Sequence, residues 1–185
     1  MAVSINIDIE ATNRCNAVCH FCPRDATPHQ GHMTMATFDQ SLHRAIEFRE
    51  TKLNDTISNI QVKPNICGLG EPLINPNTPD FIRKIRDSGF RTCGMSTNGA
   101  LLDERRGDAI LEAGVTSVNI NISDLGEDYE RIYNLPYEET RDNIVRFRTP
   151  ARNAKYRSFS STTARTLSTP RAWKSSGVAT ALRTS

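Results

Sequence analysis

The chain has 185 residues, enough for one domain with a hydrophobic core, and its net charge of +2 does not indicate binding to nucleic acid. No apolar run approaches the roughly 18 residues that span a bilayer, and the first residues lack the basic and apolar regions of a signal peptide, so we expect no membrane association. Five cysteines, an odd number with three close together, argue against a secreted disulfide framework and favour the reducing cytoplasm.

The spacing of apolar residues predicts alternating strands and helices over residues 3–148. Strands are expected at Val3–Ile9, 57–67, 90–96 and 115–122, and helices from about 37 to 50, from 77 or 78 to 89, from about 103 to 113, at 127–133 and at 137–148. Thr37 and Gln40 form a candidate capping box for the first helix, and Pro64 weakens the second strand. This alternation predicts an α/β fold with a parallel sheet and helices packed outside it.

The loops that follow the strands are the expected place for a functional site, because sites of parallel α/β folds lie at the carboxyl ends of the strands. Four segments lie at or just beyond a predicted strand end: residues 15–22, 68–72, 96–99 and 119–123. We therefore expect these four segments to converge on one rim of the sheet.

The first of these loops carries three thiols within eight residues, Cys15, Cys19 and Cys22. Thiolates favour zinc or iron–sulfur clusters over hard cations, and a set of three ligands leaves one coordination position open. A zinc knuckle that takes His20, His29 or His32 as its fourth ligand is the alternative at this point.

The CxxxCxxC spacing, with Phe21 before the last cysteine, resembles the cluster motif of the radical S-adenosylmethionine (SAM) superfamily. The resemblance implies a [4Fe–4S] cluster on Cys15, Cys19 and Cys22, with SAM bound to the fourth iron. It also implies a partial parallel (β/α) barrel of about four βα units, formed by residues 1–148.

Further residues extend the resemblance around the expected rim. Gly70, Glu71 and Pro72 resemble the family's Gly-Gly-Glu motif, which receives the SAM amino group, although this stretch also reads as a tight turn. Further SAM contacts are implied at Ser96 and Asn98, where an Asn-Gly turn is the alternative, and at Asn121 and Ser123, where relatives often carry Ser-x-Asp. Arg131 offers a cation for the SAM carboxylate, or is a solvated helix residue.

The implied activity is that of a radical SAM enzyme. Such an enzyme takes an electron from an external donor of the flavodoxin or ferredoxin type, cleaves SAM, and uses the 5′-deoxyadenosyl radical to abstract hydrogen from a small-molecule or peptide substrate. The region after residue 123 is similar to decarboxylases of antibiotic sugar–nucleoside pathways, and maturases of the SPASM type are similarly close. No side chain stands out as a general base or nucleophile. An inactive cluster-binding fragment and a non-enzymatic zinc module remain as alternatives.

Residues 149–185 differ from the rest of the chain. They hold seven Lys and Arg, no Asp or Glu, and 14 Ser and Thr, whereas residues 1–148 hold 16 basic and 21 acidic side chains, a net charge of −5. So few apolar residues predict a disordered basic tail. We expect that the barrel is C-terminally truncated, or that the reading frame shifts near residue 148, and that the edge after the fourth strand is exposed and lowers solubility.

Overall fold

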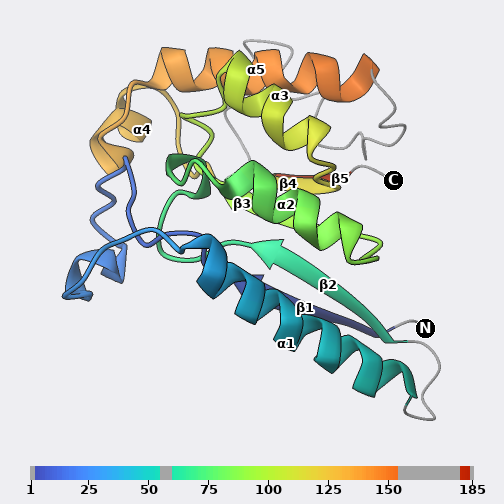
Figure 1. Ribbon diagram of the computed structural model, residues 1–185. Coiled ribbons are helices and arrows are strands. Elements are labelled where there is room, and N and C mark those ends of the chain that lie inside the picture. The colour runs from blue at the N-terminus through green and yellow to red at the C-terminus, as the bar shows by residue number, and fades with distance from the viewer. Residues whose placement is uncertain (1–2, 55–59, 154–179, 184–185) are drawn as a thin grey trace.

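A single five-stranded sheet organises the computed structural model, which describes residues 3–54, 60–153 and 180–183 (Figure 1). Strands β1 to β4 run parallel in sequence order, and β5 joins β4 antiparallel. The strands are β1 (Val3–Ile9), β2 (Ile60–Ile66), β3 (Gly94–Thr97), β4 (Ser117–Ile120) and β5 (Thr180–Arg183); the helices are α1 (Met35–Asn54), α2 (Thr78–Asp87), α3 (Glu104–Glu112), α4 (Gly126–Tyr133) and α5 (Tyr137–Asn153). Four βα units with parallel strands confirm the predicted α/β fold class.

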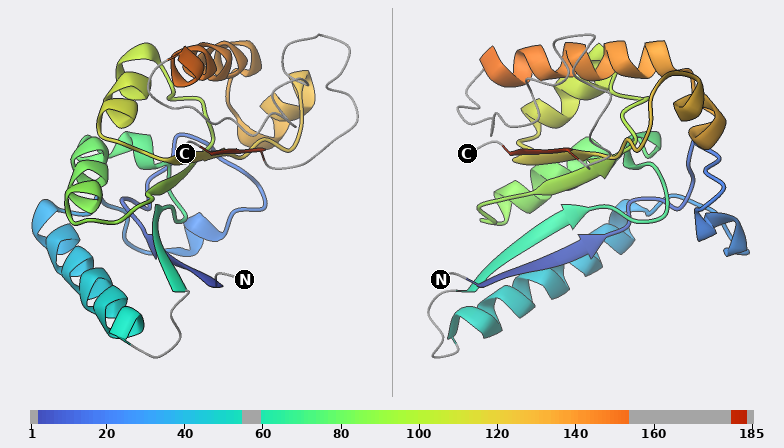
Figure 2. Two further views of the ribbon diagram at one scale, coloured as in Figure 1. Left: turned by 90° about the vertical axis from the view of Figure 1, so that its right-hand side faces the viewer. Right: turned by 180° about the vertical axis from the view of Figure 1, so that it is seen from behind.

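The two faces of the sheet differ in polarity because side chains alternate along each strand. Apolar strand residues such as Ile9, Ile66 and Met95 are buried against the helices, where Phe38 of α1 stacks on Phe81 of α2 with ring centroids 4.1 Å apart. Helices α1, α2 and α3 lie along this one face in Figure 2. The alternate strand residues are mostly polar and face the concave side, which we call the lumen.

The sheet is joined unevenly. Seven residue pairs join β1 to β2 and four join β3 to β4, but only Asn65↔Gly94 and Ile66↔Met95 join β2 to β3. Away from these pairs β2 and β3 diverge, as the views in Figure 2 show. Pro64 lies inside β2 opposite Ile7 of β1, and the pairing of β2 with β3 begins one residue later, at Asn65. We call the β2–β3 junction the seam.

Several helix ends differ from the sequence-based prediction. The candidate capping box at Thr37 is wrong, because α1 begins at Met35 and the Thr34 hydroxyl accepts a hydrogen bond from the Thr37 N–H at 3.2 Å. Thr34 is therefore the cap. Gly107 in α3 has a packing reason, since a Cβ there would lie 2.9 Å from the Phe147 ring of α5.

Two parts of the predicted tail, one at its start and one near its end, fall within the described residues. Helix α5 continues to Asn153, and Thr180–Arg183 pairs with all four residues of β4. The β4 edge is therefore paired rather than exposed as expected. The prediction of disorder for residues 154–179 falls outside the described residues.

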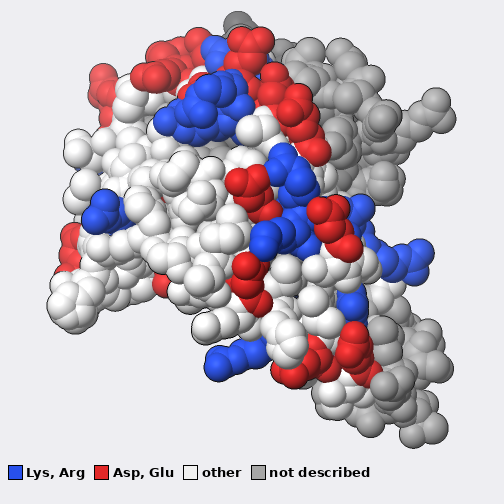
Figure 3. Space-filling view, in the orientation of Figure 1, with Lys and Arg blue, Asp and Glu red and all other residues white. Residues whose placement is uncertain are grey.

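Charges of both signs are mixed over the helical face (Figure 3). Lys84 pairs with Asp39 at 2.6 Å, and Arg83 and Arg106 pair with the aspartates three positions before them. This face therefore shows no single-sign patch suited to nucleic acid. Within the described residues, no helix combines the length and apolarity needed to cross a bilayer.

Candidate metal centre

The loop between β1 and α1 places Cys15, Cys19 and Cys22 at the carboxyl ends of the strands. Cys22 N–H donates to Cys19 C=O at 3.0 Å, which closes a tight turn that holds the last two cysteines near each other. Val18 N–H donates to Tyr133 C=O at 3.0 Å and ties the loop to the end of α4. All three thiols are free and partly exposed.

Two polar side chains hold the first cysteine in place. Buried Arg24 donates from Nη1 to the Cys15 carbonyl at 2.9 Å. Asn98, just after β3, donates from Nδ2 to Asn16 Oδ1 at 2.9 Å and lies 3.8 Å from Cys15 Sγ. The end of β3 is therefore joined directly to the cysteine loop.

An apolar cluster lies behind the thiols. Ala17, Tyr129, Tyr133 and Leu135 are buried together, with Cys15 and Cys19 packed against them. Phe21 is 61% exposed and meets the Tyr133 ring edge-on at 6.2 Å. The cluster shields one side of the cysteine loop from water, and the other side is exposed to solvent.

The donor set fits an iron–sulfur cluster better than a single ion. Among the described residues, no three His, Cys, Asp or Glu side chains gather closely enough to hold one metal ion, and this applies to the three thiols as well as to His20, His29 and His32. In a cluster each thiolate binds a different iron, so the sulfurs need not meet at one point. Burial raises the pKa of the Cys15 thiol, and burial followed by the neighbouring thiols raises that of Cys19. Metal binding must therefore displace these protons.

The loop after β2 packs tightly beside the cysteine loop. Glu71 N–H donates to Arg14 C=O at 2.8 Å, and a Cβ on Gly70 would lie only 2.2 Å from Thr12 O. Pro72 is buried and begins a short 3₁₀ turn, Pro72–Ile74. The close approach of the two backbones explains why a glycine stands at position 70.

Glu71 is a buried connector between two strand ends. Its side chain is 2% exposed, Oε1 accepts from Thr97 Oγ1 at 2.8 Å and from Leu73 N–H at 3.1 Å, and Oε2 accepts from Asn98 N–H at 2.8 Å. Burial raises the pKa of the Glu71 carboxyl above its ordinary value, while the three hydrogen bonds act in the opposite direction. Both oxygens thus have protein donors.

Gly70→Ala is expected to destabilise the apo-chain by about 1–3 kcal/mol, because the new methyl group meets backbone oxygens of residues 12 and 14 that cannot swing aside. Gly68→Ala is the matched control, since the nearest atoms to its Cβ belong to the Glu10 side chain, which can rotate away from the new methyl group at the loss of the hydrogen bond from Leu69 N–H. Denaturant unfolding of both variants measures the difference. Equal losses would contradict the tight packing inferred at Gly70.

The remaining candidate residues are spread unequally around this rim. Asn121 N–H donates to Thr97 C=O at 2.9 Å, and Ser123 Oγ lies 2.9 Å from the Tyr133 hydroxyl, so both remain tied to the site. Ser96 lies on the lumenal face of β3. Arg131 is exposed on α4 and pairs with Asp128 at 2.8 Å, and no described contact joins it to the cysteine loop. The expected convergence of the four strand-end loops is confirmed, whereas Arg131 is not brought to them.

Asn75 and Cys67 have surroundings that the sequence did not predict. Asn75 is buried and donates to the carbonyls of Ala11 at 2.8 Å and Met33 at 3.1 Å, which fixes both ends of the cysteine loop. Cys93 is fully buried, whereas Cys67 is half-buried beside Asp8 and Asn65, and burial followed by Asp8 raises the pKa of the Cys67 thiol to about 12. The sequence around Asn75, an isolated Asn after an apolar run, gives no sign that its side chain would hold both ends of the cysteine loop.

Comparison with known proteins gives a family match over most of the chain. The profile of the radical SAM superfamily matches residues 9–162. A probable GTP 3′,8-cyclase of Methanothermobacter thermautotrophicus is 31% identical over 137 residues, which are 73% of this chain and 41% of that protein. A cofactor-modifying protein for tungsten-containing aldehyde ferredoxin oxidoreductase from Pyrococcus furiosus is 32% identical over 111 residues, 60% of this chain and 28% of that protein.

A solved structure supports the fold. BtrN in complex with AdoMet and 2-DOIA superposes with a TM-score of 0.50 at 20% sequence identity, over 76% of this chain and 55% of that chain. The chain thus spans less than half the length of the cyclase and about half of the structural neighbour.

Proposed function

The chain belongs to the radical SAM superfamily, and we propose that it is a radical SAM enzyme, or the cluster-bearing part of one, acting on a small-molecule or peptide substrate. Members of this superfamily use a [4Fe–4S] cluster and SAM. When bound, this pair supplies reductive cleavage of the SAM C5′–S bond and a 5′-deoxyadenosyl radical that takes hydrogen from the substrate. The observation that carries the proposal is the placement of three free thiols beside the loops that end β2, β3 and β4.

Each loop has a separate task in this proposal. Cys15, Cys19 and Cys22 hold three irons, and the exposed Phe21 beside them shields the bound group from water. The backbone carbonyls of residues 68–70 accept hydrogen bonds from the SAM ammonium, because both Glu71 oxygens already have protein donors. Glu71 and Pro72 then act by positioning that backbone.

The polar side chains at the ends of β3 and β4 complete the SAM site. Ser96 and Asn121 have no described side-chain partner and offer hydrogen bonds to the ribose and the SAM carboxylate. Asn98 orients the cysteine loop, and Ser123 contributes through its pairing with Tyr133. Exposed Arg131 reaches SAM only by leaving Asp128, which makes it the weakest member of the set.

An external electron donor of the flavodoxin or ferredoxin type and a cytoplasmic setting are parts of the same proposal, since the cluster has to be reduced before each SAM cleavage. Residues 1–148 form the catalytic core in it, followed by the basic tail. The named relatives act in different chemistries, so no substrate is taken from them.

Anaerobic reconstitution of the 185-residue chain tests the proposal. We expect about four irons per chain, no stoichiometric zinc, and 5′-deoxyadenosine from SAM after reduction with dithionite. Iron without 5′-deoxyadenosine would instead support a cluster-binding fragment without activity. One zinc and no iron would overturn both.

A further inference from the structure

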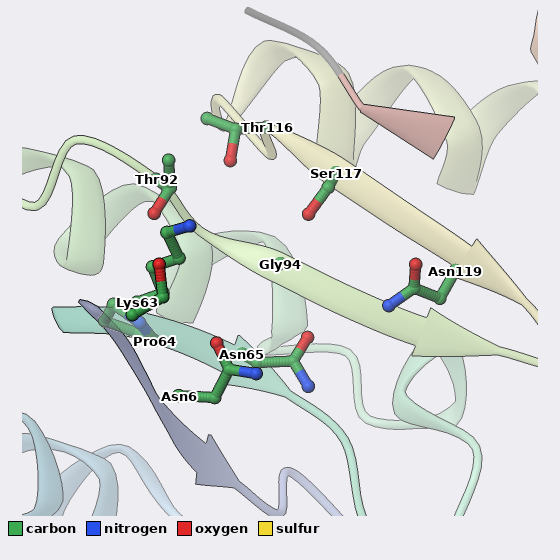
Figure 4. A pocket seen from close by; sticks show the side chains of 10 residues that line it. Asn6, Lys63, Pro64, Asn65, Thr92, Gly94, Thr116, Ser117 and Asn119 are labelled. Carbon is green, nitrogen blue, oxygen red and sulfur yellow. The ribbon is translucent and has the colours of Figure 1, made fainter. Parts of the chain in front are cut away.

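The lumen contains a polar pocket of roughly 460 Å³ to which all four parallel strands contribute (Figure 4). The side chains and backbone that line it belong to Ser4, Asn6, Lys63, Pro64, Asn65, Thr92, Gly94, Thr116, Ser117 and Asn119. Most are the strand residues that alternate with the buried apolar set, so the pocket lies on the face away from the helices. Hydrogen-bonding groups dominate this lining, unlike the apolar walls of most ligand pockets.

The described lining residues carry one charge, and one carboxylate lies just outside the lining. Lys63 is the one ionisable side chain among the described lining residues, and within the described part of the chain it makes no ion pair. Figure 4 shows its ammonium group extended toward Thr92 at the diverging part of the seam. Asp8, on the same face of β1, is level with Asn65 and accepts from Asn65 Nδ2 at 3.0 Å.

The floor of the pocket is kept open by Gly94. A Cβ at this position would lie 2.6 Å from Asn65 Oδ1 and 3.1 Å from Ser117 Oγ, so any side chain there would fill the space between them. Asn6, Ser117 and Asn119 border this space without described side-chain partners. The pocket therefore combines one cation with unpaired amide and hydroxyl groups, which is a donor-rich surface.

The pocket continues into the proposed SAM site along the same strand faces. Gly94 precedes Ser96 by two residues on β3, a step of about 7 Å along a strand, and Asn119 of β4 precedes by two residues Asn121, which directly follows the end of that strand. Gly94 and Ser117 begin β3 and β4, so the pocket lies toward the amino ends of these strands, and a molecule held there would meet the radical only by extending along the lumen toward their carboxyl ends.

We infer that the lumenal pocket binds the substrate of the proposed enzyme, and that this substrate is a hydroxyl-rich molecule whose oxyanion, a carboxylate or a phosphate, is held by Lys63. The inference rests on the proposed function for its chemical meaning. An ammonium group with three donors suits an oxyanion, and the absence of acidic lining residues among those described disfavours a cationic substrate. Asn and Ser side chains suit hydroxyl groups on the rest of the molecule.

The test measures binding of glucose 6-phosphate, glucuronate and glucose to the full-length chain by ligand-observed NMR, before any cluster or SAM is added. We expect saturable binding of at least one charged sugar in the millimolar range, with glucose about tenfold weaker. Lys63→Met is expected to reduce that binding by about tenfold or more, and Lys63→Arg to retain most of it. Lys84→Met, which removes an exposed lysine on the helical face, is the matched control and should change nothing.

The outcomes distinguish a carboxylate from a phosphate as the bound group. They also distinguish failure of the substrate pocket from failure of the proposed radical SAM function. Binding of only the phosphate or only the carboxylate sugar supports the site and identifies its group. No saturable binding of either charged sugar up to about 10 mM, equal binding of glucose, or full binding by Lys63→Met would overturn the inference. Because no cluster or SAM is present, a failure of SAM cleavage in the reconstituted chain would count against the proposed function alone.

Discussion

Cys19→Ala is expected to reduce iron in the reconstituted chain from about four per molecule to nearly none, and to abolish 5′-deoxyadenosine formation. The three thiols are the only cysteines in the loop at the strand ends, and among the described residues no His, Asp or Glu gathers with them to replace a lost ligand. Two remaining thiolates would leave two irons without protein ligands.

The same loss is expected for Cys15→Ala and Cys22→Ala, which tests the loop as a unit. Cys93→Ala is the matched control, because it removes a thiol that is fully buried on the helical side of β3. That variant should lose some stability through the small cavity it creates and should keep its iron. Iron analysis and absorption spectra measure both effects. Retention of iron and SAM cleavage by Cys19→Ala would refute the ligand assignment.

Glu71→Ala is expected to destabilise the apo-chain by about 3 kcal/mol or more. The substitution leaves the Thr97 hydroxyl and the backbone N–H groups of Leu73 and Asn98 without acceptors in a buried place. It also disconnects the loop after β2 from the end of β3. Glu47→Ala, at a side chain 63% exposed on α1, is the control and should change the unfolding free energy by at most about 0.5 kcal/mol.

Denaturant unfolding measures both glutamate variants, and pH dependence gives an independent check. Because the folded pKa of Glu71 is raised, its contribution to stability is largest below the ordinary carboxyl value and decreases as pH rises toward the raised value. Glu71→Gln should remove that decrease, although its amide nitrogen faces the Asn98 N–H and loses one hydrogen bond. Parallel pH profiles for the original chain and Glu71→Gln would contradict the raised pKa.

The elements that local sequence controls were the ones that could be predicted. Strand β1 has the predicted bounds because its alternation is uninterrupted, and Gly89 and Gly114 end their helices with positive φ angles as glycine allows. The three thiols and the neighbouring loops were located because their spacing is itself the signal. Thr34 was missed as a cap because Thr37 offers similar local chemistry three residues later.

Features that depend on tertiary contacts could not be predicted. Glu71 carries a recognisable motif, but only its burial shows that its oxygens bind protein donors rather than a ligand. Lys63 gave no signal because the adjoining Pro64 obscures the alternation of β2, and its place in the lumen follows from pairing with β1. The partner of β4 was not foreseen, since residues 180–183 have no period that indicates a strand.

The seam is the junction at which neighbouring parallel strands share the fewest paired residues. Bending at the two residue pairs between β2 and β3 would change the width around Lys63 and Thr92 at one end. At the other end, the same bending would pull on the bonds from Glu71 to Thr97 and Asn98. The pocket around Lys63 and the hydrogen bonds behind the thiol loop thus border the same junction between β2 and β3.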